Sequence, residues 1–526
     1  MRSRTNLIVI MLTGLYLWGN FIPPPIDHPY GLLSLMPVVL TVGLAFFTKN
    51  AILSLFIGIF SAGLITTSNP IAGAFKIIDP YLLDSVASKD NMKVLLFSTL
   101  VGMVVEILRV SGGTQAVIQS FMRLARGRRA AMTSTWLAGL TVFFDDYANC
   151  LIVGSSMKAV TDKAKVSREK LAYLVDSTAA PVATLALIST WIGYEVSLMD
   201  KALQAAGQSI NAYGFFIDGI GYRFYPILAL VFGLTICLTG RDFGPMWNAE
   251  QAAAQKNPEH IGYEGSQKGL IWNAILPISG LIGLTAFDLY AQGVAVLGND
   301  AALFEIIGEA DGYDAMLKGA LFAFGLAVGC ASWTGTDTHS IIKASKTGAS
   351  RLSEALLVLV CAWGIGSAIA ELQAAEYLVS VLDNAISPAW YPSLIFILSA
   401  IVAFATGTSF GTMGTLMPLA IPLCIKAGAD IDITLAVSAA VLSGATWGDH
   451  CSPISDTTVL SSAGTECDHI AHVKTQLPYA LTAGIVSLLF CSVPVGFGIH
   501  WFPCLIGGSA ACVTSIFVFG KPTKAA

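Results

Sequence analysis

The residues best suited to chemistry lie in one short segment, 443–462, which reads SGATWGDHCSPISDTTVLSS. It places two aspartates, Asp449 and Asp456, and a proline, Pro453, among hydroxyl side chains. The apolar runs on both sides are long enough to belong to a membrane. In hydrocarbon an ionised carboxylate costs about 2.5–3.5 kcal/mol, and backbone opened by a proline finds no partner in lipid. Such a segment is suited to bind a small cation and a proton.

Two earlier stretches carry similar chemistry. Asp145, Asp146 and Asn149 interrupt an apolar run, 130–160, at its middle. The sequence DSTAAP, which starts at Asp176, interrupts the first half of the next apolar run. Proline removes a helical amide donor and clashes with the preceding turn, so we expect open carbonyls there that could become ligands.

Composition sets the class of protein that must position these groups. The chain has 526 residues, 55% of them hydrophobic and only 12% charged, with a mean hydropathy of +0.69. Soluble domains carry about 25% charged residues. Long apolar runs without a dividing linker predict an all-α polytopic membrane protein, a single transmembrane transporter domain over residues 1–526. Its surroundings would be a lipid bilayer, and we expect no nucleic-acid partner.

Basic residues predict how the chain crosses the membrane. Basic clusters at 123–129 and 158–170 flank the first acidic run, and both favour the cytoplasm. A re-entrant hairpin over 130–160, with the aspartates at its tip, satisfies both flanks. A second hairpin of opposite orientation is predicted over 391–427. The count is roughly 12 transmembrane helices plus two hairpins in the cytoplasmic membrane, with both termini cytoplasmic.

The chain also predicts an internal repeat. Residues 180–190, APVATLALIST, align with 452–462, SPISDTTVLSS, so that Pro181 meets Pro453. Each break follows a candidate hairpin, which suggests two inverted repeats, a common way for transporters to build a midplane site. The first repeat covers about 51–240, with its hairpin at 130–160 and a broken helix at 171–198. The second covers about 315–498, with its hairpin at 391–427 and a broken helix at 434–464.

Two stretches of the sequence resemble a known family. FFDDYANCLIVGSSMKAVTDKAKVSREKLAYLVDSTAAPVATLALISTWIGYE and ATWGDHCSPISDTTVLSSAG are similar to the signature regions of the NhaC-type sodium/proton antiporter family. The resemblance implies sodium efflux driven by proton uptake. Relatives of the family also include exchangers of organic acids, so the resemblance leaves the substrate open.

Sodium prefers hard oxygen ligands, which the two hairpin tips and two breaks supply. No cofactor is expected beyond the transported sodium and protons. The candidate ion-binding residues are Asp145, Asp146, Asn149, Asp176, Ser177, Thr178, Thr408, Ser409, Asp449, Ser452, Ser455, Asp456 and Thr457. We expect at least one aspartate to accept sodium or a proton, never both. Asp176 and Asp456 are the leading proton carriers because each flanks a proline break, whereas a helix cap is the simpler role for any of the aspartates.

Two other functions fit parts of the pattern. Coupled transport of a small organic acid or amino acid would need positive helix ends or an arginine at the site, and neither 176–181 nor 443–462 contains an arginine. An intramembrane hydrolase fits the Ser, His and Asp content of 443–462, but that segment contains no GxSxG. The sequence leaves the oligomeric state and the stoichiometry open.

Three segments receive simpler interpretations. Glu195 is expected near the outer end of its helix, either lining an entrance or exposed. The polar segment 241–268 is expected only to connect helices, and the segment from SNPIAG to SKDNMK to be a turn-rich connection.

Overall fold

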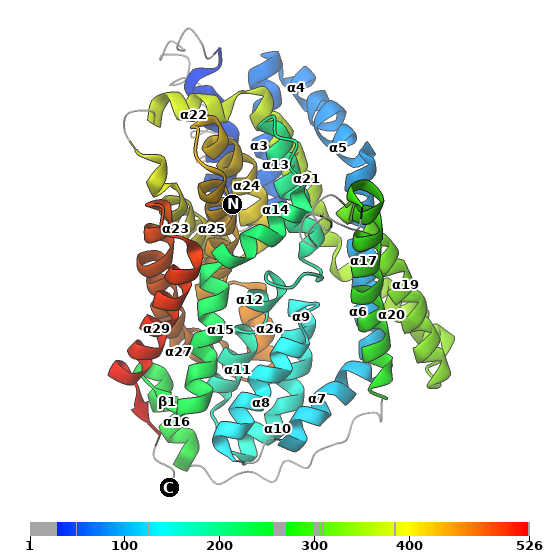
Figure 1. The fold of residues 1–526 in the computed structure, drawn as a ribbon, viewed down its shortest axis with the longest axis vertical. Helices are drawn as coiled ribbons and strands as arrows, with labels where there is room; N and C mark the ends of the chain where they lie inside the picture. The colour runs from blue at the N-terminus through cyan, green and yellow to red at the C-terminus, as the bar shows by residue number, and fades with distance from the viewer. Residues whose placement is uncertain are drawn as a thin grey trace.

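The structure, a computed structural model, describes residues 29–48, 50–124, 127–255, 270–298, 310–382 and 386–523, together with residue 306. Nearly all of this chain is helical (Figure 1). Strands in these ranges are limited to β1 (Arg241–Asp242) and β2 (Lys521–Pro522), which pair antiparallel. The predicted all-α class is confirmed. The first of the predicted membrane helices, expected over about residues 6–22, lies outside the described residues.

Seven helices in the described part are long and apolar enough to cross a membrane, or nine if each of two bent pairs is one span. The seven spans are α17 (Trp272–Leu297), α19 (Gly312–Trp333), α20 with α21 (Thr338–Glu371), η5 with α23 (Pro388–Thr406), α25 (Ile431–Cys451), α27 to α28 (His469–Gly496) and α29 (Trp501–Phe519). The bent pairs are α6 (Lys89–Val110) with α7 (Gly113–Leu124) and α14 (Ala212–Asp218) to α15 (Phe224–Thr239). The chain is therefore a multi-pass membrane protein, and the count of 12 stays a prediction.

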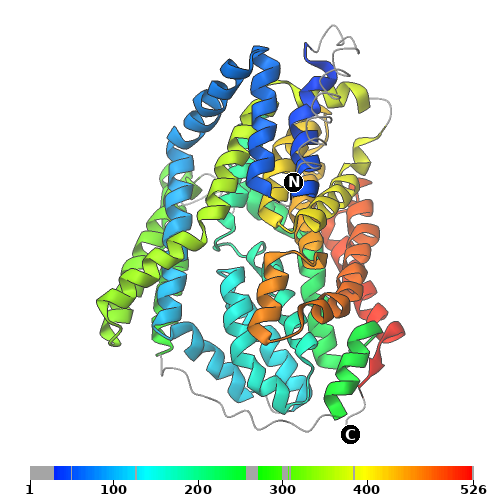
Figure 2. The same ribbon diagram turned by 180° about the vertical axis from the view of Figure 1, so that it is seen from behind.

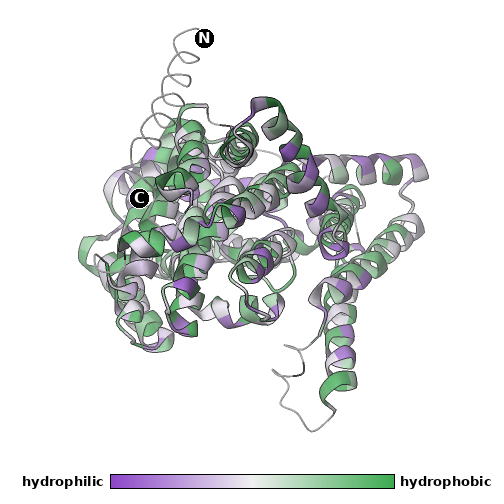
Figure 3. Ribbon diagram, turned by 90° about the horizontal axis from the view of Figure 1, so that it is seen from above, coloured by the Kyte–Doolittle hydropathy of each residue, from purple (hydrophilic) through white to green (hydrophobic). Residues whose placement is uncertain are grey.

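The helices form a main body and a lateral bundle. The bundle contains α6, α17, α19 and α20 (Thr338–Arg351), which pack on one another along one side of the molecule (Figures 1 and 2). Seen from above, helices of the bundle project away from the body, and apolar residues dominate most helices (Figure 3). The chain bends between α6 and α7, and α7 leads from the C-terminal end of α6 into the body (Figure 1).

The first acidic run forms two antiparallel helical segments joined at the aspartates. Helix α8 (Arg128–Thr141) leads to a turn, and α9 (Asp146–Ala148), η3 (Asn149–Val153) and α10 (Gly154–Lys163) lead back. The next run is interrupted as predicted, because α11 (Arg168–Asp176) ends before α12 (Ala180–Ala183) begins. It is interrupted a second time, since residues 184–191 are irregular before α13 (Ile192–Ala205) starts. The prediction of one break within 171–198 is therefore incomplete.

The second half repeats the order of elements. Helix α23 (Tyr391–Thr406) turns at Gly407 into α24 (Ser409–Lys426), and the turn needs the positive φ of 68° that glycine adopts readily. Helix α25 then breaks at residues 452–455 before α26 (Asp456–Thr465), as predicted. Pro453 lies inside this break, but Pro181 lies in the first turn of α12, so the two prolines do not occupy equivalent positions.

Two connecting segments differ from the prediction. The segment predicted to be turn-rich is helical over α4 (Pro70–Lys76), η2 (Ile77–Leu82) and α5 (Leu83–Ala87). Asn69 explains its start, because its side chain accepts hydrogen bonds from two backbone amides and Pro70 suits the first turn.

The segment after α15 is more than a connection. Its first part forms β1 and α16 (Gly244–Gln255), and it supplies two buried carboxylates. Asp242 pairs with the buried Lys170 of α11, and Glu250 pairs with Arg128 of α8. These ion pairs attach the first turns of α8 and α11 to β1 and α16, a segment that the sequence predicted only to connect helices.

Candidate functional site

The turn of the first hairpin contacts the break of the second half. The Tyr147 hydroxyl donates a hydrogen bond to Oδ2 of Asp456, the first residue of α26. The Cys150 thiol lies 3.6 Å from the carbonyl oxygen of Thr457. Helix α26 approaches so closely that a Cβ on Gly464 would lie 2.5 Å from the Cys150 carbonyl oxygen. Segments some 300 residues apart therefore build one site.

Asn149 joins the first hairpin to the first break. Its Nδ2 donates to the carbonyl oxygens of Gly139 in α8 and Thr178 after α11, both at 2.8 Å. The side chain is fully buried, and among the described residues its Oδ1 has no hydrogen-bond partner. An unpaired buried acceptor is costly, and a cation would satisfy it.

Asp449 supplies a second such acceptor. It lies in the last turn of α25, 1% exposed, and its Oδ2 accepts a long hydrogen bond of 3.4 Å from the Thr457 hydroxyl. The Thr457 hydroxyl is also 3.1 Å from that of Ser455. Asp449 Oδ1 is buried and has no hydrogen-bond partner in the described part of the chain. Carboxylate and hydroxyl oxygens therefore meet at the second break.

Asp145 and Asp146 bring two more carboxylates to this place. Asp145 caps α9, with its side chain 2.6 Å from the amide of Ala148, which is the simpler role considered for it. Both aspartates are buried, and the charge of Asp146 is opposed by those of Asp145 and Asp456. Like charges held together in this way repel one another unless a cation or proton is bound.

Asp176 is held on the other side of α26. Its Oδ2 accepts hydrogen bonds from Thr458 (3.1 Å) and Gln476 (2.7 Å) and lies 3.4 Å from Nε2 of His472. Gln476 also donates to the carbonyl oxygen of His450, at 2.7 Å. Asp176 thus ties α11 to α26 and α27 (His469–Val486), a structural task that the other site carboxylates do not share to the same degree.

The remaining predicted ligands divide by where their hydroxyls point. Ser177, Thr178, Ser409 and Ser452 donate to backbone carbonyls around the breaks. Thr408 caps α24 and lines a small cavity with Thr41 and Ser54 of the first helices. The Thr408 side chain therefore serves the start of α24 and lies towards α3 (Ala51–Thr67), and within the described ranges no hydrogen bond joins it to the acidic residues.

Several residues of the site escaped the sequence reasoning. Tyr147 stands between two predicted ligands in the sequence, so its position was a usable signal. Gln476 and His472 lie on the following helix, and nothing in their spacing predicts a contact with Asp176.

Glu195 differs most from its prediction, because it is fully buried rather than at an entrance or exposed. Its Oε2 lies 2.9 Å from Nη1 of Arg223, and its Oε1 accepts from the Thr184 hydroxyl at 2.6 Å. Arg223 also donates to the Thr184 carbonyl oxygen and lies over the ring of Phe216. This ion pair secures the irregular segment 184–191 at its start.

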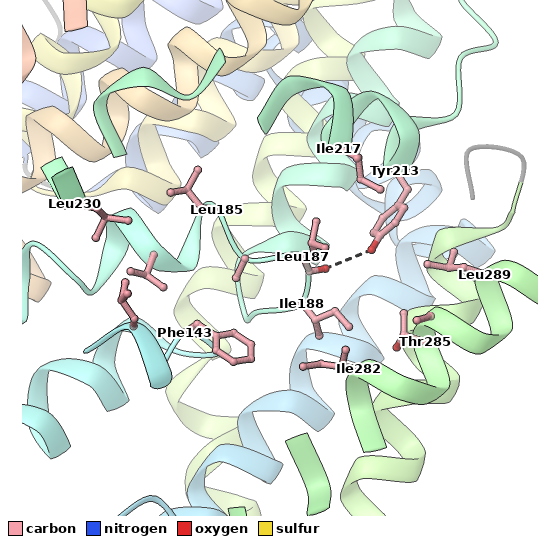
Figure 4. A pocket seen from close by; sticks show the side chains of 14 residues that line it. Phe143, Leu185, Leu187, Ile188, Tyr213, Ile217, Leu230, Ile282, Thr285 and Leu289 are labelled. Atoms are coloured by element: carbon pink, nitrogen blue, oxygen red, sulfur yellow. Dashed lines mark hydrogen bonds between the residues drawn. The ribbon is translucent and has the colours of Figure 1, made fainter. Parts of the chain in front are cut away.

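An apolar cavity lies beside this segment. It has a volume of about 550 Å³ and is lined almost wholly by apolar side chains. Leu187 and Ile188 lie between Phe143 on the body and Ile282 and Leu289 of α17 (Figure 4). Among the described residues no three His, Cys, Asp or Glu side chains are placed to hold a metal ion, so a sodium site here would need hydroxyl, amide or carbonyl oxygens as well.

Comparison with known proteins decides the family. The profile of the Na+/H+ antiporter family matches residues 182–493. The chain belongs to the Na+/H+ antiporter family. The predicted resemblance is confirmed, and membership of this family identifies a transporter rather than an enzyme.

The chain is also similar to individual proteins, in sequence to two bacterial proteins and in fold to a solved structure. An uncharacterised protein of Haemophilus influenzae is 32% identical over 515 residues, 94% of this chain and 96% of that protein. The malate-2H+/Na+-lactate antiporter of Bacillus subtilis is 35% identical over 153 residues, 28% of this chain and 31% of that one. The fold resembles the structure of MtrF of Neisseria gonorrhoeae, with a TM-score of 0.56, 12% identity and coverage of 97% and 98% of the two chains.

Proposed function

We propose that the chain exchanges sodium for protons across the cytoplasmic membrane by competition at the carboxylates Asp146, Asp449 and Asp456. The observation that carries this proposal is the pair of buried, unpartnered oxygens on Asn149 and Asp449, beside four carboxylates. A desolvated acidic site with open acceptors attracts either a small cation or a proton, and occupation by one displaces the other.

The proton-carrying role is assigned first to Asp456. Its side chain is accessible at the surface of the protein, whereas Asp449 is buried, and this difference supports the assignment. Its Oδ2 accepts from Tyr147, and its Oδ1 accepts from the amide of Thr457 at 3.0 Å. Asp176 is the second candidate, but its three polar neighbours make structural support its main proposed task.

Alternation between the two sides is proposed to use two inverted repeats, about 51–240 and 315–498. The support is the matching order of two antiparallel helical segments followed by a broken helix. Helix breaks at the centre give each half a pair of helix ends, and helix C-terminal ends favour cations. Both termini are placed at the cytoplasmic side in this proposal, on the strength of the basic clusters.

The test is proton flux by the purified full chain in liposomes, read with an internal pH dye as an outward or inward sodium gradient is imposed. Asp456→Asn should abolish sodium-dependent proton flux while the protein stays folded. Asp337→Asn is the matched control, because Asp337 caps α20 with an exposed side chain. Unchanged flux in the Asp456 variant would remove this residue from the mechanism. Repeating the wild-type measurement at set membrane voltages gives the charge moved per cycle.

A further inference from the structure

A cavity with a polar lining lies between the lateral bundle and the first hairpin. Its volume is about 390 Å³, and its lining combines two arginines, two other polar residues from the start of α7, and part of the first hairpin. The lining residues are Arg109, Val110, Thr114, Gln115, Leu151, Ile152, Ser155 and Arg351. Leu151 and Ile152 lie two and three residues after Asn149, so the cavity adjoins the carboxylate site.

The charge of this cavity is positive. Glu106 is buried beside it and binds both arginines: Arg109 through Nε (3.0 Å) and Nη2, and Arg351 through Nη1 (2.9 Å). The two guanidinium groups and the one carboxylate that contacts them together carry a net charge of about +1. Each guanidinium has five N–H donors, and these bonds occupy only some of them. Glu106 therefore orients both arginines and leaves donors directed elsewhere.

The start of α7 contributes further donors. The chain bends by 61° between α6 and α7 and turns through Gly112 with a φ of +72°. The first amides of a helix have no partner inside it, and the helix dipole makes this end positive. Asn273 of α17 fixes the bend by donating to the Ser111 carbonyl oxygen at 3.2 Å. The positive end of α7 is thus held at the cavity.

Thr114 gives independent evidence for a ligand. Its side chain lines the cavity and is 3% exposed. Within the ranges that the structure describes, its hydroxyl oxygen is buried without a hydrogen-bond partner. A buried hydroxyl beside two arginines and a helix N-terminus lacks only an acceptor, and an anionic oxygen would supply it.

We propose that this cavity binds the carboxylate of a small organic anion that is carried in the same transport cycle. Arg109 and Arg351 would hold the carboxylate, and the hydroxyl of Thr114 would donate to it. The charges of Arg351 and Asp145 act on one another, so binding of an anion here is felt at the cation site. The inference rests on the proposed exchange function and supplies arginines, which the break segments 176–181 and 443–462 lack.

The direct test is equilibrium binding of radiolabelled acetate, succinate and glutamate to the full chain in phosphatidylcholine vesicles, at constant sodium. We expect at least one to bind, and Arg351→Gln to weaken that binding roughly ten- to a hundredfold. Because Arg351→Gln leaves Glu106 with one partner fewer, Thr114→Val is the second variant, and it should weaken binding without changing any charge. Arg129→Gln, an arginine on α8 away from the cavity, is the control.

Three results would overturn the proposal. In the first, none of the three anions binds above empty vesicles. In the second, neither Arg351→Gln nor Thr114→Val alters the binding. In the third, inorganic phosphate, or phosphatidylglycerol added to the vesicles, displaces the label as effectively as unlabelled carboxylate, which would assign the cavity to phosphate or lipid headgroups.

Failure of the proposed exchange would be distinguishable from these results. Sodium-driven proton flux is measured without any organic acid, so its absence together with Arg351-dependent binding would reject the exchange and keep the anion site. Persistent sodium-driven flux in vesicles where no carboxylate binds would do the reverse.

Discussion

The Tyr147 hydroxyl donates a hydrogen bond to Asp456 across 309 residues of sequence. The bond joins the turn of the first hairpin to the first residue of α26, and so connects the two halves of the chain at a carboxylate proposed to carry protons. A donor at this oxygen stabilises the ionised carboxylate relative to the protonated one.

Tyr147→Phe should therefore retain exchange but favour protons over sodium. A hydrogen bond to a charged group contributes about 1.5–3 kcal/mol, so the sodium concentration for half-maximal flux should rise roughly tenfold or more. The measurement is sodium dependence of proton flux at fixed pH. Tyr290→Phe on α17, where the side chain is exposed, should leave the dependence unchanged. Equal sodium dependence of wild type and Tyr147→Phe would mean that this bond has no part in ion selection.

Asp176→Asn should affect stability more than Asp456→Asn does. Asp176 receives bonds from Thr458 and Gln476 and faces His472, so its replacement weakens the attachment of α11 to two other helices. Hydrogen bonds to charged groups contribute about 1.5–3 kcal/mol each. Thermal unfolding of the two purified variants in detergent, measured side by side, tests this. A lower Tm for the Asp456 variant would contradict the division between structural and ion-binding aspartates.

Arg223→Met should destabilise the protein strongly. The substitution leaves Glu195 buried without its cation, and breaking a buried pair from one side costs about 3–5 kcal/mol. The double variant Arg223→Met with Glu195→Gln should recover part of the loss, because no unpaired charge remains. Denaturation of wild type, single and double variants forms a thermodynamic cycle, and strictly additive effects would argue that the pair is not coupled.

Gly464→Ala should impair exchange by forcing α26 away from the first hairpin. The added Cβ would lie 2.5 Å from the backbone oxygen of Cys150, which cannot rotate away as a side chain could. Gly325→Ala in α19 is a matched control, because nothing lies within 4 Å of a Cβ there. Loss of flux with retained folding is expected only for Gly464→Ala. Similar flux in the two variants would show that the contact tolerates displacement.

The sequence predicted the interruption after Asp176 and the one at 452–455 because their causes are local, but it missed the irregular segment 184–191. Pro453 and the acidic residues near it interrupt an apolar run, and an interrupted apolar run in a membrane protein has few alternative explanations. The two antiparallel segments around Asp145 were predictable for the same reason, since charge at the centre and basic flanks on both sides restrict the path of the chain.

Contacts between distant segments could not be predicted. Arg109 and Arg351 belong to no motif. Arg109 lies three residues after Glu106 on α6, but only the packing of α6 against α20 brings Arg351 to the same carboxylate. The sequence did not predict that Glu195 pairs with Arg223. The hydropathy of the segments around both residues is compatible with a buried or an exposed position for each side chain. Thr408 was chosen from its polar neighbours, but side-chain direction at a helix start depends on the capping bond, which requires coordinates.

The two hydrogen bonds of the Asn149 amide have a mechanical consequence. The Asn149 side chain links a carbonyl of α8 to a carbonyl of the first break, so a displacement of Asn149 would be transmitted to both stretches of backbone. A ligand that pulls on the free oxygen of the same amide acts on both stretches at once.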